Sequence, residues 1–182
     1  MILSKHPKLM DDTELESAIK GIIEQRYPES HTLDYKAEIS LEGQQKRIEL
    51  AKDISSFANE SGGIIIYGVP EVVSNGTPIP SPLTNCGIDI PGKLPQDIEN
   101  ILFDIISPPL PELEVRIITP DCLNGKSLLV MYHPASWSKP HMVAGYSHGR
   151  FYRRGSFRAT IMTEKEIEMA YLSRVTSIKN AE

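Results

Sequence analysis

Residues 54–69 decide the fold: Ile54-Ser55-Ser56-Phe57-Ala58-Asn59-Glu60-Ser61-Gly62-Gly63-Ile64-Ile65-Ile66-Tyr67-Gly68-Val69. The first part continues a helical pattern, which predicts a helix from about Gln45 to Asn59. Its core-facing stripe is Ile48, Ala51, Ile54, Ser55 and Ala58. The glycine pair supplies the left-handed backbone that a helix end requires. The apolar run from Ile64 to Val69 is typical of a strand covered on both faces, and we expect it to be the central strand.

The opposite side of this helix carries charged residues. We expect them to face solvent, and they are Lys46, Glu49, Lys52 and Asp53.

The segment before this helix alternates well enough to predict a strand over 32–39. Alternation places Leu33 and Tyr35 on one face and both Asp34 and Lys36 on the other. Further upstream, apolar residues at helical spacing predict an amphipathic helix over about 12–27, with Asp12 or Thr13 as its cap.

The remaining elements follow from turn and helix signals. A loop is expected over 70–91, and a helix over 94–106 that ends before three prolines. Strands over 113–118 and 127–132 are predicted to form a hairpin through the Asn124-Gly125 turn. A strand over 150–154 and a helix over 163–174 complete the chain, with Thr163 and Glu166 at capping-box spacing. The fold class is α/β (mixed α+β), with a mixed central sheet flanked by helices.

Composition limits the function classes. The 182 residues suit a single domain over 1–182, or one cut from something longer, and no run of about 20 apolar residues is present to cross a membrane. The two cysteines are far apart and no secretory signal is visible, so a cytoplasmic location with reduced thiols is expected. The histidines lack zinc-ligand spacing. A net charge of −5 disfavours a protein that coats nucleic acid, so any contact with phosphates must be local.

Four segments, taken in order, resemble the AlbA-like domain of the Schlafen superfamily. Each is weak alone, whereas their order and spacing span most of the chain. They are Glu29-Ser30-His31-Thr32-Leu33-Asp34-Tyr35-Lys36, then Ile54 to Gly63 leading into Ile66-Tyr67-Gly68-Val69, then Phe151-Tyr152-Arg153-Arg154-Gly155-Ser156, and the helix opening Thr163-Glu164-Lys165-Glu166-Ile167.

The resemblance implies a mixed α/β fold with a groove that faces nucleic acid. Similar domains include ribonucleases that act on tRNA or rRNA, and bacterial regulators or antiviral defence proteins in which the domain accompanies an ATPase or a helix-turn-helix module. We therefore expect a metal-dependent endonuclease that favours RNA, with tRNA-like or single-stranded substrates. An ATPase or another defence-system protein, and a second copy of the chain, are the expected protein partners, and no membrane is expected.

Position by position, the resemblance assigns a three-carboxylate site to Glu29, Asp34 and Glu71, with Lys36 beside it. Oxygen ligands of this kind suit Mg²⁺ or Mn²⁺, which stabilise the charge that develops when a phosphodiester is cleaved. Lys36 would orient water or stabilise that charge. The alternative is that Asp34 and Lys36 form a solvated pair on a strand face and that Glu29 merely follows Pro28.

A second candidate group would bind nucleic acid by combining cations with aromatic side chains. It comprises Lys139, Tyr152, Arg153, Arg154 and Arg158. Strand alternation puts Tyr152 and Arg154 on one face and Arg153 on the other, so only one face can meet a ligand. The alternative is an edge strand whose charges discourage aggregation. Trp137 has two candidate roles, which are stacking on a base and closing the core, and the sequence does not decide between them.

Two other functions stay open at this point. One is a non-catalytic DNA- or RNA-binding module of a larger regulator or anti-phage complex, and the other is a protein-interaction domain.

Overall fold

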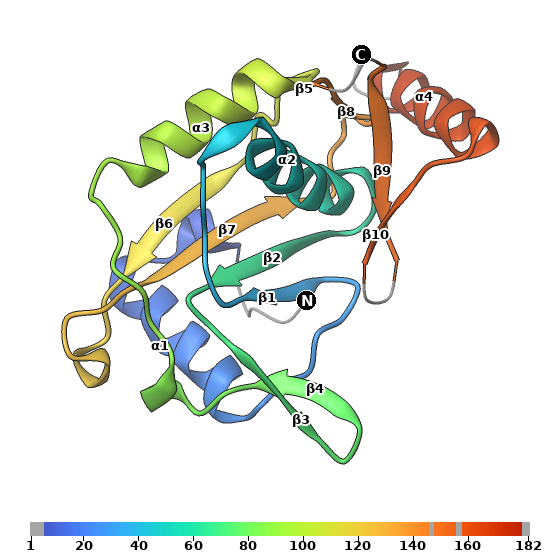
Figure 1. Ribbon diagram of the computed structural model, residues 1–182. Coiled ribbons are helices and arrows are strands. Elements are labelled where there is room, and N and C mark those ends of the chain that lie inside the picture. Colours follow the sequence, from blue (N-terminus) through green and yellow to red (C-terminus); the bar gives the residue numbers. More distant parts are fainter. Residues whose placement is uncertain (1–5, 146–147, 156–157, 180–182) are drawn as a thin grey trace.

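The computed structural model describes residues 6–145, 148–155 and 158–179, and Ser156 of the third motif lies outside them. Its central sheet has the strand order β1-β2-β7-β6 (Figure 1). The strands are β1 (Leu33–Lys36), β2 (Gly62–Tyr67), β7 (Leu128–Pro134) and β6 (Glu114–Ile118). β1 runs parallel to β2, and the other pairs are antiparallel. The expected mixed sheet is therefore confirmed.

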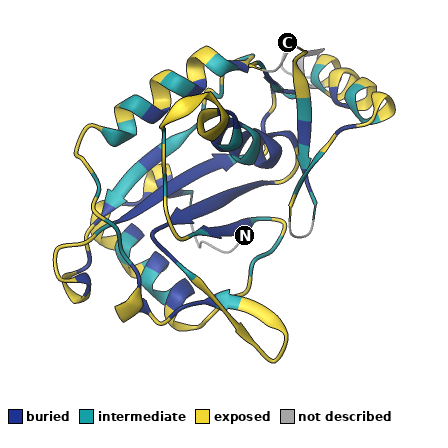
Figure 2. Ribbon diagram, viewed as in Figure 1, coloured by how far each residue is buried: buried dark blue, intermediate teal, exposed yellow. Residues whose placement is uncertain are grey.

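Helices cover both faces of this sheet. α1 (Asp12–Glu24) packs against the face that carries Leu33, Ile64 and Ile66. α2 (Gly43–Asn59) and α3 (Leu94–Ile105) pack against the other face, which carries Ile65 and Tyr67. Figure 2 shows the central strands as the buried layer between them. The result is three layers with one apolar core on each side of the sheet.

Every residue of β2 is buried, as the continuous apolar run predicts. The glycine pair opens β2 rather than ending α2, whose C-cap is Glu60. Gly62 has a φ of +76°, and a Cβ there would lie 2.5 Å from the backbone nitrogen of Ala135. A Cβ on Gly63 would lie 2.2 Å from the Phe57 ring. The pair is needed for close packing as well as for backbone conformation.

A second sheet, in the order β10-β9-β8-β5, lies across the C-terminal end of α2. Its strands are β10 (Ala159–Ile161), β9 (Arg150–Arg154), β8 (Met142–Val143) and β5 (Ile106–Ser107). The Asn59 side chain holds this sheet to α2, donating to the carbonyls of His141 and Tyr152 at 3.0 and 2.8 Å. α4 (Glu164–Lys179) lies outside β9 (Figure 1).

The segment expected to be a loop contains a hairpin, so the prediction of a loop was wrong over part of 70–91. β3 (Glu71–Ser74) pairs with β4 (Thr77–Pro80) through Asn75-Gly76, both with positive φ. Asn-Gly is the strongest short hairpin signal, but the prolines around it obscured the strand pattern. Figure 2 shows this hairpin to be mostly exposed.

Short 3-10 helices lie between several of these elements. They are η1 (Pro7–Leu9), η2 (Leu83–Asn85) and η3 (Asp121–Leu123). The hairpin predicted around Asn124-Gly125 is present as β6 and β7, with both turn residues at positive φ.

The N-terminal caps were predicted for two helices, wrongly for α1 and correctly for α4. α1 is capped by Asp11, whose side chain accepts from the Glu14 backbone at 2.8 Å, and not by Asp12 or Thr13. The capping box of α4 is confirmed, because Glu166 accepts from the Thr163 backbone at 2.7 Å.

Within the described part of the chain, no helix has the length and apolar character needed to cross a membrane.

The close contact at Gly63 gives a testable expectation. Gly63→Ala would drive a methyl group into the Phe57 ring and should lower the free energy of unfolding by about 1–3 kcal/mol, the usual cost of overpacking. Gly92→Ala is the matched control, because a Cβ there meets open space. Urea unfolding of both variants checks this, and equal midpoints for the two would contradict it.

Candidate functional site

β1 directs the predicted polar pair towards α2. Leu33 and Tyr35 belong to the core on the α1 side, so Asp34 and Lys36 point to the α2 side, as strand alternation predicts. Asp34 is 1% exposed, whereas the Lys36 side chain is 37% exposed. Asp34 is therefore not part of a solvated surface pair.

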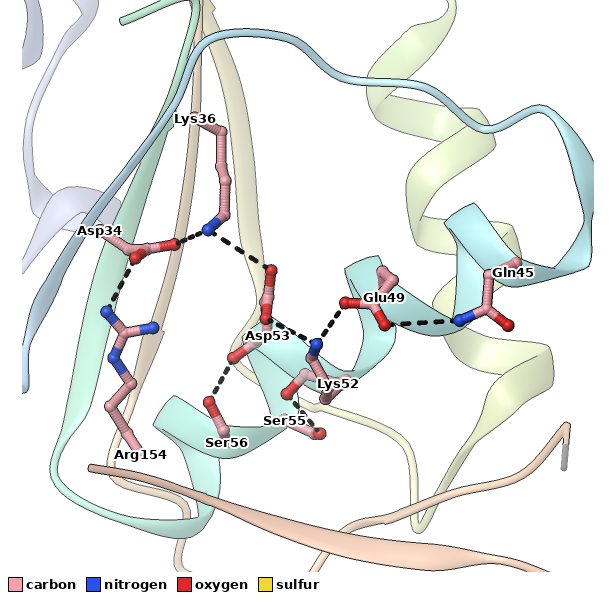
Figure 3. A network of polar contacts seen from close by, with 9 residues as sticks. All are labelled: Asp34, Lys36, Gln45, Glu49, Lys52, Asp53, Ser55, Ser56 and Arg154. Atoms are coloured by element: carbon pink, nitrogen blue, oxygen red, sulfur yellow. Dashed lines mark hydrogen bonds and ion pairs between the residues drawn. The ribbon is translucent and has the colours of Figure 1, made fainter. Parts of the chain in front are cut away.

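Two protein cations hold the Asp34 carboxylate (Figure 3). Arg154 Nη2 donates to Oδ1 at 2.8 Å, and Lys36 Nζ lies 2.8 Å from Oδ2. Burial pushes the pKa of Asp34 upward, but its hydrogen bond with Glu29 and the charges of Lys36 and Arg154 outweigh burial and hold the pKa below its usual range. Asp34 is an anion at neutral pH.

Arg154 reaches this position from β9, and it is itself 3% exposed. Its guanidinium lies over the Phe57 ring, 4.6 Å from the centroid, which is a cation-π distance. Arg154 thus joins the second sheet to the central sheet. Its side chain serves the interior of the domain and is not presented to a ligand at the surface.

Glu29 approaches the same carboxylate from the segment before β1. Its Oε1 accepts from the Tyr35 backbone N–H at 3.0 Å. Burial and the hydrogen bond with Asp34 raise the pKa of Glu29 to about 7, and the charges of Asp34 and Glu71 act in the same direction. Glu29 therefore holds its proton more tightly than a free glutamate does, next to the ionised Asp34.

Glu71, at the start of β3, lies at the edge of this group and is exposed. Partial burial raises its pKa, and the negative charge of Asp34 adds to the effect while Lys36 opposes it. The structure therefore brings together all four residues that the resemblance predicts, with Glu71 the most loosely held.

Asp53 is a site residue that the sequence analysis missed. The prediction that it faces solvent was wrong, because its side chain is only 15% exposed. Its Oδ2 lies 3.9 Å from Lys36 Nζ and its Oδ1 lies 3.9 Å from Lys52 Nζ (Figure 3). Burial raises the pKa of Asp53 to about 6 against the attraction of both lysines.

The charges alternate from α2 to β9. Lys52 also pairs with Glu49, so the order runs from Glu49 through Lys52, Asp53, Lys36 and Asp34 to Arg154. Burial lowers the pKa of Lys36, but the carboxylates of Asp34 and Asp53 outweigh burial and raise the pKa above its usual value. Lys36 is a fixed positive charge at the exposed edge of the site.

The donor set does not fit a divalent metal in this arrangement. Both oxygens of Asp34 already face protein cations, and Glu29 Oε1 accepts from the Tyr35 backbone N–H. Over residues 6–145, 148–155 and 158–179, no three His, Cys, Asp or Glu side chains are arranged to hold a metal ion. The carboxylates are neutralised by protein groups instead.

The predicted nucleic-acid contacts divide between the two faces of β9. Tyr152 is buried, like Arg154, on the inner face. Arg153 points the other way, towards α4, where its Nε lies 2.6 Å from Glu166 Oε1. Arg158 is exposed on the connection from β9 to β10, and Lys139 is half-buried before β8. Only the outer face of β9 can meet a ligand.

The family model Schlafen, AlbA_2 matches residues 29–161, a stretch that runs from Glu29 to the end of β10. The chain belongs to this family. The resemblance predicted from the four segments is confirmed, and the Schlafen AlbA_2 region contains every candidate site residue discussed above. α1 and α4 lie outside it.

A solved structure, the N-terminal domain of a RecG-related protein from Nitrosomonas europaea, is similar at 19% identity with a TM-score of 0.49. The similarity covers 86% of this chain and 96% of that one. No curated protein matches the chain.

The raised pKa of Glu29 predicts a pH-dependent stability. The folded-state pKa of about 7 lies above the usual glutamate pKa of 4.5, so the stabilisation is complete below pH 4.5 and is lost as the pH rises through 7. Glu29→Gln cannot lose a proton and should gain stability relative to the wild type over this window. Urea unfolding at several pH values measures the difference, and a constant difference would contradict the assignment.

The two neighbouring arginines of β9 form a matched pair for a second test. Arg154→Met leaves Asp34 buried without its guanidinium and should cost about 3–5 kcal/mol of unfolding free energy. Arg153→Met removes a partly exposed ion pair with Glu166 and should cost less than about 1 kcal/mol. Denaturant unfolding compares them, and similar losses would show that the Asp34 pair does not anchor β9.

Proposed function

We propose that this Schlafen AlbA_2 domain binds nucleic acid and cleaves RNA at the site formed by Glu29, Asp34 and Lys36. The observation that carries the proposal is the cluster itself, in which Lys36 Nζ lies 2.8 Å from Asp34 Oδ2 and Glu29, held by the Tyr35 backbone, has a pKa that burial raises to about 7. General acid-base groups work best when their pKa lies near the operating pH.

RNA suits these residues better than DNA does. Its 2′-hydroxyl is an internal nucleophile, so cleavage requires a base to accept that proton and a positive charge to stabilise the developing phosphorane. Glu29 in its ionised form would accept the 2′-hydroxyl proton as the 2′-oxygen attacks the phosphorus, and Lys36 would face the phosphoryl oxygens. The P–O5′ bond would then break, leaving a 2′,3′-cyclic phosphate and a 5′-oxygen that takes a proton from protonated Glu29. Single-stranded or loop segments, as in tRNA-like molecules, are the preferred substrates because their bases and backbone are free to adopt the attacking geometry.

Asp34 would support both partners without touching the substrate. Its negative charge, held by Arg154, raises the pKa of Glu29 and of Lys36. Removing the charge of Asp34 would therefore disturb the base and the cation together, as well as leaving Arg154 unpaired in the interior.

Dependence on Mg²⁺ or Mn²⁺, with Glu29, Asp34 and Glu71 as ligands, stays a prediction of the resemblance. Asp34 would have to exchange a protein cation for the metal. The acid-base proposal does not require this exchange, and a chelator separates the two.

A non-catalytic DNA- or RNA-binding module is the second candidate. The observation that favours it is that both oxygens of Asp34 are paired, one with Arg154 and one with Lys36. Ion pairs that only stabilise the fold have this arrangement. A defence or regulatory role, an ATPase partner and self-association are further predictions from the resemblance. They apply equally to a catalytic and a non-catalytic domain.

Cleavage of a single-stranded RNA and of a tRNA tests the proposal. Glu29→Gln should reduce the cleavage rate by at least about 100-fold, since it removes the base. Lys36→Gln should reduce it by a similar factor, since it removes the charge at the phosphoryl oxygens. Glu24→Gln, at the exposed end of α1, is the control and should cleave like the wild type. A DNA strand of the same sequence should stay intact.

The outcomes separate the candidates. Cleavage that survives both Glu29→Gln and Lys36→Gln in folded proteins would refute the site. Cleavage that EDTA abolishes and Mn²⁺ restores would assign the metal-dependent mechanism instead of the acid-base one. Salt-sensitive binding without any cleavage would leave the binding module. Absence of affinity at low salt would leave a protein-interaction domain.

A further inference from the structure

A pocket of about 450 Å³ lies between β9 and α4, on the opposite side of β9 from Asp34. We propose that it binds one nucleotide of a single-stranded nucleic acid, with the phosphate at its cations and the base against its apolar wall. The inference rests on the proposal that this domain handles nucleic acid, and it adds a holding site apart from the Glu29 cluster. The volume lies in the range of small-ligand pockets.

Three cations from separate segments line the pocket. They are Lys139 before β8, Arg153 of β9 and Lys165 of α4. Cations that the fold gathers from distant parts of the sequence concentrate positive charge locally, although the whole chain carries −5. A protein with a negative net charge needs such a local group of cations in order to bind a polyanion.

The pairing of these cations leaves charge available for a ligand. Glu166 fixes the Arg153 guanidinium through Nε, at 2.6 Å, and also accepts from Thr163 at the start of α4. The side chains of Lys139 and Lys165 form no hydrogen bond or ion pair with any residue the structure describes. Glu60 also lines the pocket, so three cations face two carboxylates.

Part of the remaining wall is apolar and suits a base, and Asn59, Thr163 and Ser173 supply polar groups beside it. Met162 and Ala170 are buried at the back, and Met169 is largely exposed at the side. Thioether side chains are flexible and polarizable, so they adapt to a flat aromatic surface without selecting one base. A cationic rim beside an adaptable apolar wall fits a nucleotide better than it fits an inorganic anion.

The pocket depends on a helix that the family match does not include. Lys165 and Met169 belong to α4, whereas the matched region ends at Ile161. The pocket is therefore inferred from this chain's own residues. Alternation along β9 links it to the other site, because Arg153 faces the pocket while Arg154 holds Asp34.

Titration of the isotope-labelled protein with a 2′-O-methyl RNA decamer, followed by NMR, tests the inference without cleavage. The amide signals of Lys139, Arg153 and Met169 should shift together. AMP should shift the same signals at higher concentration, since it offers one base and one phosphate. Inorganic phosphate that binds as tightly as AMP would remove the role of the base and overturn the proposal, as would binding of AMP with no binding of the decamer.

The double variant Lys139→Gln, Lys165→Gln should bind the decamer more weakly, and the slope of log K against log salt should fall by about 0.7, the value for one phosphate contact on a single strand. Lys126→Gln, an exposed lysine between η3 and β7, is the matched control. Thermal melting verifies that all proteins are folded. Equal affinities for the double variant and the control would overturn the pocket.

Glu29→Gln keeps the two proposals distinguishable. In this protein the decamer should still shift the amide signals of Lys139, Arg153 and Met169, because Glu29 does not line the pocket. Binding at the pocket in a protein that never cleaves RNA would refute the proposed cleavage and leave the nucleotide pocket standing.

Discussion

The ion pair between Asp34 and Arg154 is the interaction on which the arrangement depends. It joins β1 of the central sheet to β9 of the second sheet, and both side chains are removed from water. A buried ion pair gains little over an apolar contact of the same shape, but a single partner left alone is very unfavourable. The pair therefore acts as a constraint: with Asp34 on β1, the inner face of β9 needs the arginine, and with Arg154 on β9, β1 needs the carboxylate.

This constraint also sets the electrostatics of the candidate site. Burial and the hydrogen bond with Asp34 raise the pKa of Glu29 to about 7. Asp34 itself stays ionised through its hydrogen bond with Glu29 and the charges of Lys36 and Arg154. The negative charge of Asp34 also raises the pKa of Lys36, so a group that exchanges its proton near neutral pH and a group that keeps its proton lie beside the same carboxylate. The pattern of paired groups with separated pKa values is common at functional sites.

The layered fold could be predicted because helical and strand periodicities record which face of each element is covered. The same alternation placed Asp34 and Lys36 on one face before any tertiary information was used. Periodicity could not show that Asp53 of α2 lies beside Lys36. A charged residue next to the apolar face of a helix is expected to be exposed unless its partner on another element is known. Burial of Arg154 was hidden for the same reason. The hairpin around Asn75-Gly76 carried a visible signal, which the neighbouring prolines masked.

The two faces of β9 divide the cations of the chain into two kinds. On the inner face, Arg154 is neutralised by Asp34 and does not have a charge to offer a polyanion. On the outer face, Arg153 keeps part of its guanidinium beside two lysines that no described residue pairs. In a chain with a net charge of −5, we infer that attraction of nucleic acid comes mainly from the outer group, because Arg154 is already balanced by Asp34. In the two proposals, the outer face of β9 then binds the nucleic acid and the Glu29 cluster on the inner side acts on it, and the alternation of side chains along β9 separates the two.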